Sequence, residues 1–301
     1  MIIIVNADDL GYSTHRDCGI FDCFRNNKIS AASLLVNGPT AAQAAHTAAE
    51  EGLHLGLHLN FTEGQPVSSN VPSLVQASGY MYYKLTFWQR DFQIEDICRE
   101  TVAQLEQFRT LTGHYPQHVD SHQHVHIIPR VAKAIAPILK KYGVTSIRIP
   151  DEDVSKYTWL PVRRWQRLTQ RYATAINARH IYFKFGIVAP NCFRGLGIGG
   201  ALMTKQRLES ALEGTVGTVE IMVHPGLGGT AQTDGFNDMF DLSQDRVNEL
   251  KQLEYFSSVP LSDWSAALGK ASTVGAAVVV TGAATDDMIV TNVARTTITK
   301  K

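Results

Sequence analysis

The sequence has no excess of either charge, because Lys plus Arg and Asp plus Glu number 28 each among 301 residues. A protein without a positive field has little to draw it toward nucleic acid or anionic lipid, so we expect neither as a partner. No uncharged apolar stretch is long enough to span a bilayer. The apolar run over residues 2–5 is too short for a signal-peptide core and follows no basic residue. We therefore expect a cytoplasmic protein without membrane contact.

Cysteine is scarce and scattered. Cys18, Cys23, Cys98 and Cys192 show no CxxC spacing, so the sequence suggests neither a zinc knuckle nor a disulfide framework. The simplest interpretation is a reduced, cytosolic enzyme. The length predicts one large α/β domain or two smaller domains. After about Trp264 the sequence turns to small residues, Thr and Val. We expect a catalytic domain over residues 1–265 and an appended tail over 266–301, whose order the sequence does not define.

Apolar runs and helical spacings alternate along the chain, without an internal repeat. Strands are predicted over residues 2–5, 31–36, 53–60, 118–120, 146–149, 181–188 and 219–223. Helices are predicted over residues 16–26, 41–51, 94–112, 131–142, 160–178 and 203–213. Strands that alternate with helices over this length imply a parallel sheet, either open or closed into a barrel.

Polar clusters follow four of these strands at their carboxyl ends. Asp8 and Asp9 follow the first strand, and His58 closes the strand over 53–60. His122 follows the strand near 118–120, and His224 follows the strand over 219–223. In barrels and open α/β sheets this edge is where active sites are built. Four clusters on one edge favour a single site over four unrelated features.

The two adjacent carboxylates have two interpretations. Asp8 and Asp9 could merely cap the next helix or close a turn. In the functional interpretation they divide their roles, because adjacent residues of an extended segment point in different directions. One carboxylate would then hold a cation, which keeps it ionised despite burial, while the other accepts a proton.

Five of the eleven histidines fall between residues 114 and 126. The alternate positions 118, 120, 122, 124 and 126 would point to one side of an extended chain. A histidine-rich surface loop is the alternative interpretation. We select His122 as a metal ligand, with His124 and His126 as contacts of the ligands or of the substrate. His58 alone would more often be a satisfied core histidine, and we select it because it lies on the same edge.

Two imidazoles and one carboxylate leave open positions for water and substrate. This set suits Zn²⁺, Fe²⁺, Mn²⁺ or, less comfortably, Mg²⁺. A bound cation lowers the pKa of a water, to about 7 on zinc, and so makes a nucleophile near neutral pH. His224 lies in a His-Pro-Gly sequence that could be only a turn. Its ordinary pKa near 6.5 would suit a general acid that protonates a leaving amine.

Residues 195–200 (GLGIGG) match the GxGxxG pattern, with a predicted strand before them and a helix after them. Glu220 lies about twenty residues further on, as the dinucleotide fingerprint requires. That acid should close its strand, however, and here His224 holds the closing position. Residues 190–194 also separate the predicted strand from the glycines. We therefore favour a substrate-side loop over a nucleotide site.

Residues 5–12 (VNADDLGY) resemble the opening motif of the YdjC/ChbG-like carbohydrate deacetylases. Residues 33–38 (SLLVNG), 56–60 (GLHLN), 118–126 (HVDSHQHVH) and 224–226 (HPG) match later motifs in the same order. The similarity runs from residue 2 to roughly 260, and the HVDSHQHVH block is highly specific. Leu10 stands where the family usually has Phe, and the tail after Trp264 matches no part of the family pattern.

The resemblance implies a distorted (β/α) barrel like that of polysaccharide deacetylases. It also implies a divalent cation, usually taken as Mg²⁺, and cleavage of the N-acetyl group from chitooligosaccharide-like substrates. By position, it implies that Asp9, His58 and His122 hold the metal, that Asp8 is the base and that His224 is the acid.

The resulting hypothesis is metal-dependent hydrolysis of N-acetyl groups from acetylated oligosaccharides, which releases acetate. The metal-activated water would be the nucleophile, and the acetylated oligosaccharide would be the partner; a homo-oligomer is compatible with the sequence. Two alternatives stay open. The chain could hydrolyse another ester or amide class on the same edge, or it could bind sugars without activity.

Overall fold

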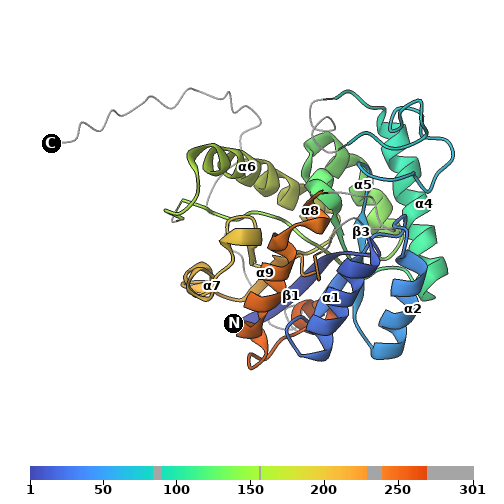
Figure 1. The fold of residues 1–301 in the computed structure, drawn as a ribbon. Coiled ribbons are helices and arrows are strands. Elements are labelled where there is room, and N and C mark those ends of the chain that lie inside the picture. The colour runs from blue at the N-terminus through green and yellow to red at the C-terminus, as the bar shows by residue number, and fades with distance from the viewer. Residues whose placement is uncertain (84–89, 156, 229–238, 270–301) are drawn as a thin grey trace, which may run out of the picture.

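The computed structural model describes residues 1–83, 90–155, 157–228 and 239–269. Seven parallel strands form one sheet in the order β5-β4-β3-β2-β1-β7-β6. The sheet curls into part of a barrel with helices packed around it (Figure 1), which confirms the predicted α/β barrel-like fold. The strands are β1 (Ile2–Leu10), β2 (Ala31–Leu34), β3 (Leu55–Leu59), β4 (His118–Ser121), β5 (Ser146–Ile147), β6 (Cys192–Arg194) and β7 (Thr218–Val223).

β1 is a central strand of this sheet and pairs with β2 on one side and β7 on the other. Eight of its nine residues are buried, which explains the unbroken apolar run at residues 2–5. Because all seven strands are parallel, their carboxyl ends meet at one edge. The polar residues that follow the apolar runs are therefore gathered there.

Helices connect the strands and cover the outer face of the sheet (Figure 1). Local signals fix several of their ends: the Ser13 side chain accepts a hydrogen bond from the Arg16 amide at the start of α1, and Gly113 ends α4 with a left-handed φ of 84°. The helices are α1 (Thr14–Arg25), α2 (Ala41–Glu51), α4 (Ile94–Thr112), α5 (Pro129–Lys141), α6 (Val162–Lys184), α7 (Lys205–Leu212), α8 (Met239–Leu242), α9 (Gln244–Gln252) and α10 (Trp264–Gly269). Short 3₁₀ segments are η1 (His122–Ile127), η2 (Gly200–Leu202) and η3 (Leu253–Phe256).

The strand predicted over residues 181–188 is wrong. α6 continues to Lys184, and Ile181 and Tyr182 belong to its buried face together with Ala175 and Ala178. Their spacing of three and four residues is helical, and it was hidden because the apolar residues 181–188 also form a compact cluster in sequence. The strand before the glycine-rich segment is instead β6, a short strand that the sequence did not predict.

α10 packs at the amino-terminal ends of the strands. The Trp264 ring is fully buried and stacks on His118, with ring centroids 4.5 Å apart. Its Nε1 donates a hydrogen bond to Asn6 Oδ1 at 3.2 Å. The predicted boundary after residue 265 falls within α10, and residues 270–301 of the predicted tail lie outside the described residues. Within the described ranges, no helix combines the length and apolar character needed to cross a membrane.

Candidate active site

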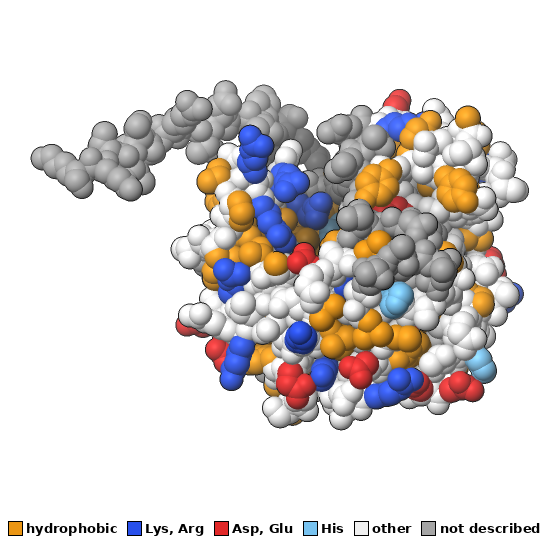
Figure 2. Space-filling model, in the orientation of Figure 1, with side chains coloured by type: hydrophobic (Ala, Val, Ile, Leu, Met, Phe, Trp, Pro, Cys, Tyr) orange, Lys and Arg blue, Asp and Glu red, His pale blue; other side chains and the backbone are white. Residues whose placement is uncertain are grey.

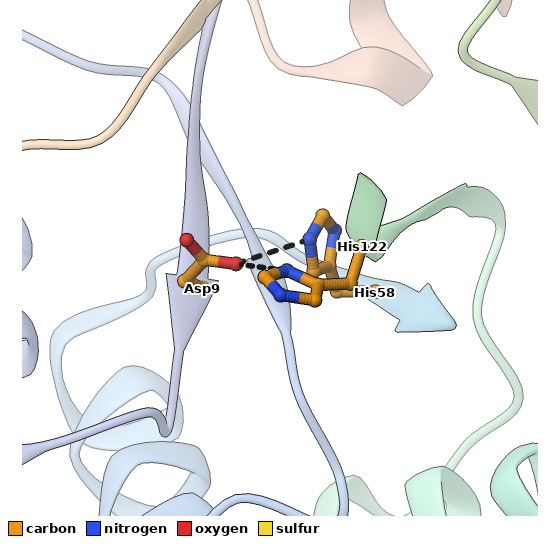
Figure 3. A group of neighbouring side chains, drawn as sticks. All are labelled: Asp9, His58 and His122. Carbon is orange, nitrogen blue, oxygen red and sulfur yellow. Dashed lines mark hydrogen bonds and ion pairs between the residues drawn. The ribbon is translucent and has the colours of Figure 1, made fainter. Parts of the chain in front are cut away.

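Three of the predicted site residues meet at the carboxyl edge of the sheet (Figure 3). Asp9 comes from β1, His58 from β3 and His122 from the first position of η1 after β4, and their side chains point toward one another. Asp9 Oδ1 lies 2.9 Å from His122 Nδ1 and 3.2 Å from His58 Nε2. One ligand atom from each residue lies within 4.8 Å of the others, so the three could contact a common ion.

An irregularity in β1 brings both carboxylates of the Asp pair to one cavity. A regular strand would direct adjacent side chains to opposite faces. Here the register between β1 and β2 shifts between Ala7 and Leu10, and Asp9 has a left-handed φ of 66°. Such a backbone costs about 1–3 kcal/mol in a residue other than glycine. With this backbone conformation, the side chains of Asp8 and Asp9 line the same cavity.

His58 is held by a carboxylate on the neighbouring strand. β3 and β4 pair with His58 opposite Asp120, and His58 Nδ1 lies 2.6 Å from Asp120 Oδ1. Burial disfavours the charged ring, but the Asp120 carboxylate and the contact with Asp9 outweigh it and raise the pKa of His58 to about 10. The ring is therefore fixed between two carboxylates, one at each nitrogen.

His122 has the same arrangement with different partners. Its Nδ1 faces Asp9, and its Nε2 lies 3.3 Å from Glu63 Oε1. The Tyr12 hydroxyl donates a hydrogen bond to the other Glu63 oxygen at 3.1 Å. Burial opposes protonation of His122, but Asp9 and Glu63 raise its pKa to about 9. Glu63 carried no sequence signal, because the loop after β3 has no recognisable motif.

The donor set fits a divalent cation. Each imidazole presents one nitrogen to Asp9 and the other to a carboxylate, the arrangement in which outer carboxylates orient metal-binding histidines. Three buried carboxylates (Asp9, Asp120 and Glu63) contact two imidazoles that must be neutral to bind a metal. Arg16 pairs with Asp9, and Arg148 is shared by Asp120, Asp8 and Glu220, so negative charge remains that a dication would offset.

Asp8, His58 and Asp120 form a second group of possible metal ligands. In this group the two carboxylates are already paired with the side chain of Arg148. The Arg148 guanidinium lies 2.5 and 2.6 Å from the two Asp8 oxygens and 3.0 Å from Asp120 Oδ2. It also contacts Glu220 at 2.5 Å. Burial raises the pKa of Asp8, while Arg148 opposes that rise. Sequence reasoning missed Arg148, which lies just after β5.

His224 follows β7, and its side chain is 17% exposed. Its Nε2 lies 3.7 Å from Asp8 Oδ2. The backbone positions the residue, because the His224 amide donates to Glu249 Oε2 and the His224 carbonyl accepts from Arg246. Burial lowers the pKa of His224 well below its usual value, and the charge of Arg246 adds to this. The imidazole is therefore neutral near pH 7 before a reaction begins.

One cavity of about 500 Å³ joins these groups, a volume in the range of small-ligand sites. Asp8 and His224 lie on its wall beside the three residues of Figure 3. All five residues selected from the sequence thus share one cavity: Asp8, Asp9, His58, His122 and His224.

His124 and His126, the two histidines predicted to contact the ligands or the substrate, differ in their relation to the cavity. The extended chain ends at Ser121, because Gln123 and His124 have left-handed φ values of 58° and 56°. The prediction that alternate side chains from 118 to 126 point to one side of an extended chain is therefore wrong beyond the end of β4. His124 lines the cavity, whereas His126 is fully buried and is not part of the cavity wall. His126 Nε2 donates to the Arg148 carbonyl, and its Nδ1 accepts from the Ser121 hydroxyl.

The glycine-rich segment directly follows β6, so the separation of strand and glycines inferred from the sequence is wrong. Its amides have a protein partner instead of a phosphate. The buried Glu152 carboxylate accepts hydrogen bonds from the amides of Gly195, Leu196 and Gly197 at 3.4, 2.6 and 3.1 Å. These amides, which in a dinucleotide-binding loop would face a phosphate, thus already have a carboxylate of the chain as their acceptor.

The family profile described as YdjC-like protein matches residues 2–267. The chain is 35% identical over 274 residues to a carbohydrate deacetylase of Homo sapiens, which covers 84% of each chain. It is 31% identical to a carbohydrate deacetylase of Xenopus laevis, covering 89% of this chain and 94% of that protein. Identity to a chitooligosaccharide deacetylase of Yersinia pestis is 30%, over 78% and 86% of the two chains.

A solved structure from Enterococcus faecalis has the same fold. The protein, whose suggested role is cellobiose-phosphate cleavage, superposes with a TM-score of 0.59 at 20% identity. The match covers 87% of this chain and 96% of that one. At this identity the similarity describes the fold alone.

Proposed function

Because the chain belongs to the YdjC-like protein family, we propose that it is an enzyme that removes acetyl groups from N-acetylated carbohydrates. Relatives that match most of the chain are named carbohydrate deacetylase and chitooligosaccharide deacetylase. The observation that carries the proposal is the cavity in which Asp9 contacts both His58 and His122 while Asp8 and His224 line the same wall.

Asp9, His58 and His122 would hold a divalent cation. When bound, such an ion would supply Lewis-acid chemistry. It would polarise the acetyl carbonyl and lower the pKa of a water, so that the water can lose a proton and act as the nucleophile. The family resemblance implies Mg²⁺, and two imidazoles also suit Zn²⁺. The residues of the chain then have to position the acetyl group, take a proton from the attacking water and return one to the departing amine.

Asp8 is the base in this proposal. Arg148 contacts both of its oxygens and so fixes the carboxylate at the cavity wall. Burial raises the pKa of Asp8, which makes the ionised form a stronger proton acceptor than an ordinary aspartate. Asp8 takes the proton as the new carbon–oxygen bond forms.

His224 is the acid. Because burial keeps its imidazole neutral, it must gain a proton before it can donate one. Its Nε2 lies 3.7 Å from Asp8 Oδ2, so the proton collected by Asp8 has a short path to His224. His224 then protonates the amine nitrogen as the carbon–nitrogen bond breaks, and acetate and a free amino sugar are the products.

The test pairs metal analysis with turnover. Purified protein is stripped with a chelator, reconstituted with Mg²⁺ or Zn²⁺, and assayed for acetate release from N-acetylglucosamine oligomers, with phosphate esters in parallel. We expect acetate release that depends on the cation. Phosphate release alone would assign the site to a different hydrolase. A bound cation without any turnover would favour a sugar-binding protein.

A further inference from the structure

Arg16 is a buried arginine that has no part in the proton transfers described above. Figure 2 shows Lys and Arg side chains on the surface of the molecule, whereas the side chain of Arg16 has no exposed area. Its guanidinium lies between two carboxylates, Asp9 of β1 and Asp241 of α8. Because arginine stays protonated in proteins, a full positive charge is held beside a proposed metal ligand. Such a charge weakens the attraction of the site for a cation, so it must serve another purpose there.

The two oxygens of the Asp9 carboxylate have different partners. Oδ1 lies 2.9 Å from His122 Nδ1 and 3.2 Å from His58 Nε2, and Figure 3 shows both contacts meeting at this one oxygen. Oδ2 accepts a hydrogen bond from Arg16 Nη1 at 3.2 Å. The carboxylate is therefore oriented with one oxygen toward the two imidazoles and the other toward α1.

Asp241 and Ser13 hold the guanidinium of Arg16 on its other side. Arg16 Nε donates to Asp241 Oδ1 at 2.9 Å, and Nη2 lies 2.8 Å from the same oxygen. The Ser13 hydroxyl donates to Asp241 Oδ2 at 2.7 Å, and the Asp241 side chain is buried. Because the guanidinium is a rigid planar fork, it cannot turn away from Asp9 without breaking the ion pair with Asp241.

The first turn of α1 also fixes the backbone that follows Asp9. The Asp17 carboxylate accepts hydrogen bonds from the Gly11 amide at 2.7 Å and from the Thr40 hydroxyl at 2.6 Å. Gly11 comes two residues after Asp9, whose left-handed backbone needs support from its surroundings. α1 therefore positions this segment twice, through the backbone by Asp17 and through the Asp9 carboxylate by Arg16.

We propose that Arg16 is a positioning residue that keeps Asp9 a one-oxygen ligand, because it holds Oδ2 and leaves only Oδ1 free for the cation. The inference rests on the proposed role of Asp9 as a metal ligand. A carboxylate can bind a cation through one oxygen or through both. Binding through both would fill one more coordination position, and a catalytic site needs open positions for water and substrate. Arg16 therefore lowers the affinity for the cation and keeps a position open.

The first variant is Arg16→Met, which removes the charge and keeps much of the volume. Zn²⁺ is titrated into chelator-treated protein, and acetate release from N-acetylglucosamine oligomers is measured at saturating Zn²⁺. We expect the dissociation constant to fall at least about threefold, because a positive charge is removed. We expect kcat to fall by about 10- to 100-fold. A purely structural role would weaken metal binding together with activity, so weaker Zn²⁺ binding, or an unchanged kcat, would overturn the proposal.

Asp241→Asn should have the opposite effect on metal affinity. Without the Asp241 charge, Arg16 is balanced by Asp9 alone, so the dissociation constant for Zn²⁺ should rise by about tenfold. A change of the same sign in Arg16→Met and Asp241→Asn would contradict the proposal. Arg25→Met is the matched control and should leave Zn²⁺ affinity and kcat unchanged, since Arg25 is an exposed arginine of α1 paired with Glu51.

The double variant Arg16→Met/Asp241→Asn guards against misfolding. Arg16→Met alone leaves the buried Asp241 charge without this partner, which can prevent folding. The double variant removes both charges, and it should bind Zn²⁺ more tightly than the wild-type protein and turn over more slowly. Its unfolding temperature is recorded. Zn²⁺ binding weaker than that of the wild-type protein, in a folded double variant, would overturn the proposal.

Crystal structures of the Zn²⁺-loaded proteins test the binding mode without turnover. In the wild-type protein we expect one Asp9 oxygen at about 2.0–2.2 Å from the ion, and in the Arg16→Met or double variant we expect both oxygens in contact with it. Two-oxygen contact in the wild-type protein would overturn the proposal, and so would a protein that binds no cation beside Asp9. One-oxygen contact without any acetate release would retain the role of Arg16 and reject the proposed deacetylation.

Discussion

His58 Nδ1 lies 2.6 Å from Asp120 Oδ1, while Nε2 of the same ring lies 3.2 Å from Asp9 Oδ1. The register of β3 and β4 sets this pair, because it places the two residues opposite each other. With its Nδ1 proton directed to Asp120, the ring offers the Nε2 lone pair to the site. The affinity of the site for a cation should therefore depend on Asp120, although Asp120 is not one of the three proposed ligands.

Asp120→Asn should weaken the binding of a divalent cation by about 10- to 100-fold, since the amide orients and polarises the His58 ring less than a carboxylate does. The dissociation constant is measured by titrating the metal into chelator-treated protein. Asp120 also contacts Ser33 and Arg148, so the unfolding temperature is recorded to establish that the variant is folded. Asp91→Asn, which removes an exposed carboxylate, is the control. Unchanged affinity in a folded Asp120 variant would refute the dependence.

Asp8→Asn should reduce turnover by about 10²- to 10⁴-fold, the usual contribution of a general base. The amide keeps an oxygen for Arg148 but cannot take a proton from water. Acetate release and metal content are measured on the same preparation, and the metal content should equal that of the wild-type protein because Asp8 is not among the three proposed ligands. Activity close to the wild-type value would remove Asp8 from the role of base.

His58→Ala should lose both the cation and the activity. The substitution removes one of three proposed ligands and leaves Asp120 without its imidazole partner. His46→Ala is a suitable control, because His46 is exposed on α2. Metal content is measured by elemental analysis after dialysis. If the variant retained a full equivalent of metal, the ion would have to bind somewhere other than beside Asp9 and His122.

Glu152→Ala should destabilise the fold, because it leaves the buried amides around Gly195–Gly197 without an acceptor. Each unsatisfied buried donor costs about 1–3 kcal/mol, so the free energy of unfolding should fall by several kcal/mol. Glu209→Ala, at an exposed position of α7, should change it by less than about 0.5 kcal/mol. Urea denaturation of both variants measures the difference, and equal effects would show that the glycine-rich segment does not need Glu152.

His126 should make stability depend on pH. Burial lowers its pKa to about 4 in the folded protein, whereas the unfolded chain keeps a value near 6.5. Between these values the unfolded state binds a proton that the folded state does not. The free energy of unfolding therefore falls as the pH falls, by up to about 3 kcal/mol from this group.

His126→Gln removes that titration, although it also loses hydrogen bonds to Ser121 and Arg148. Its stability deficit against the wild-type protein should therefore be largest at pH 7 and should shrink toward pH 5. Urea denaturation at pH 7, 6 and 5 measures the trend, with His46→Gln, a substitution at an exposed position of α2, as the control. A deficit that grows on acidification would contradict the lowered pKa.

The five selected site residues could be predicted because chain direction constrains them. Asp9, His58 and His224 each follow or close an apolar strand, and in a parallel sheet those ends share one edge whatever the strand order is. No knowledge of the helices is needed for that conclusion. Residue chemistry suggested His122 as a metal ligand and His224 as an acid, whereas the family resemblance assigned Asp9 to the metal and Asp8 to the base; all of these roles stay predictions.

The supporting charges could not be found in the same way. Arg148 lies in a predicted strand as a single charged residue, and nothing in the sequence names Asp8, Asp120 and Glu220 as its partners. The available signal was that a charge inside an apolar strand has to be paired once it is buried. The error over residues 181–188 has a related cause, because a short apolar cluster fits a helix face and a strand equally well until its neighbours in space are known.

The place of β1 in the sheet has a consequence for how the protein is made. β1 is the earliest of the described strands to be synthesised, and β2 follows it closely, but its other neighbour β7 begins only at Thr218. On the ribosome, one edge of this apolar strand stays unpaired until nearly three quarters of the chain exists, and an open edge is a template for association with other nascent chains. Translation that stops before Val223 leaves that edge exposed beside Asp8 and Asp9, so truncated products should aggregate and should need chaperones, quite apart from any loss of catalysis.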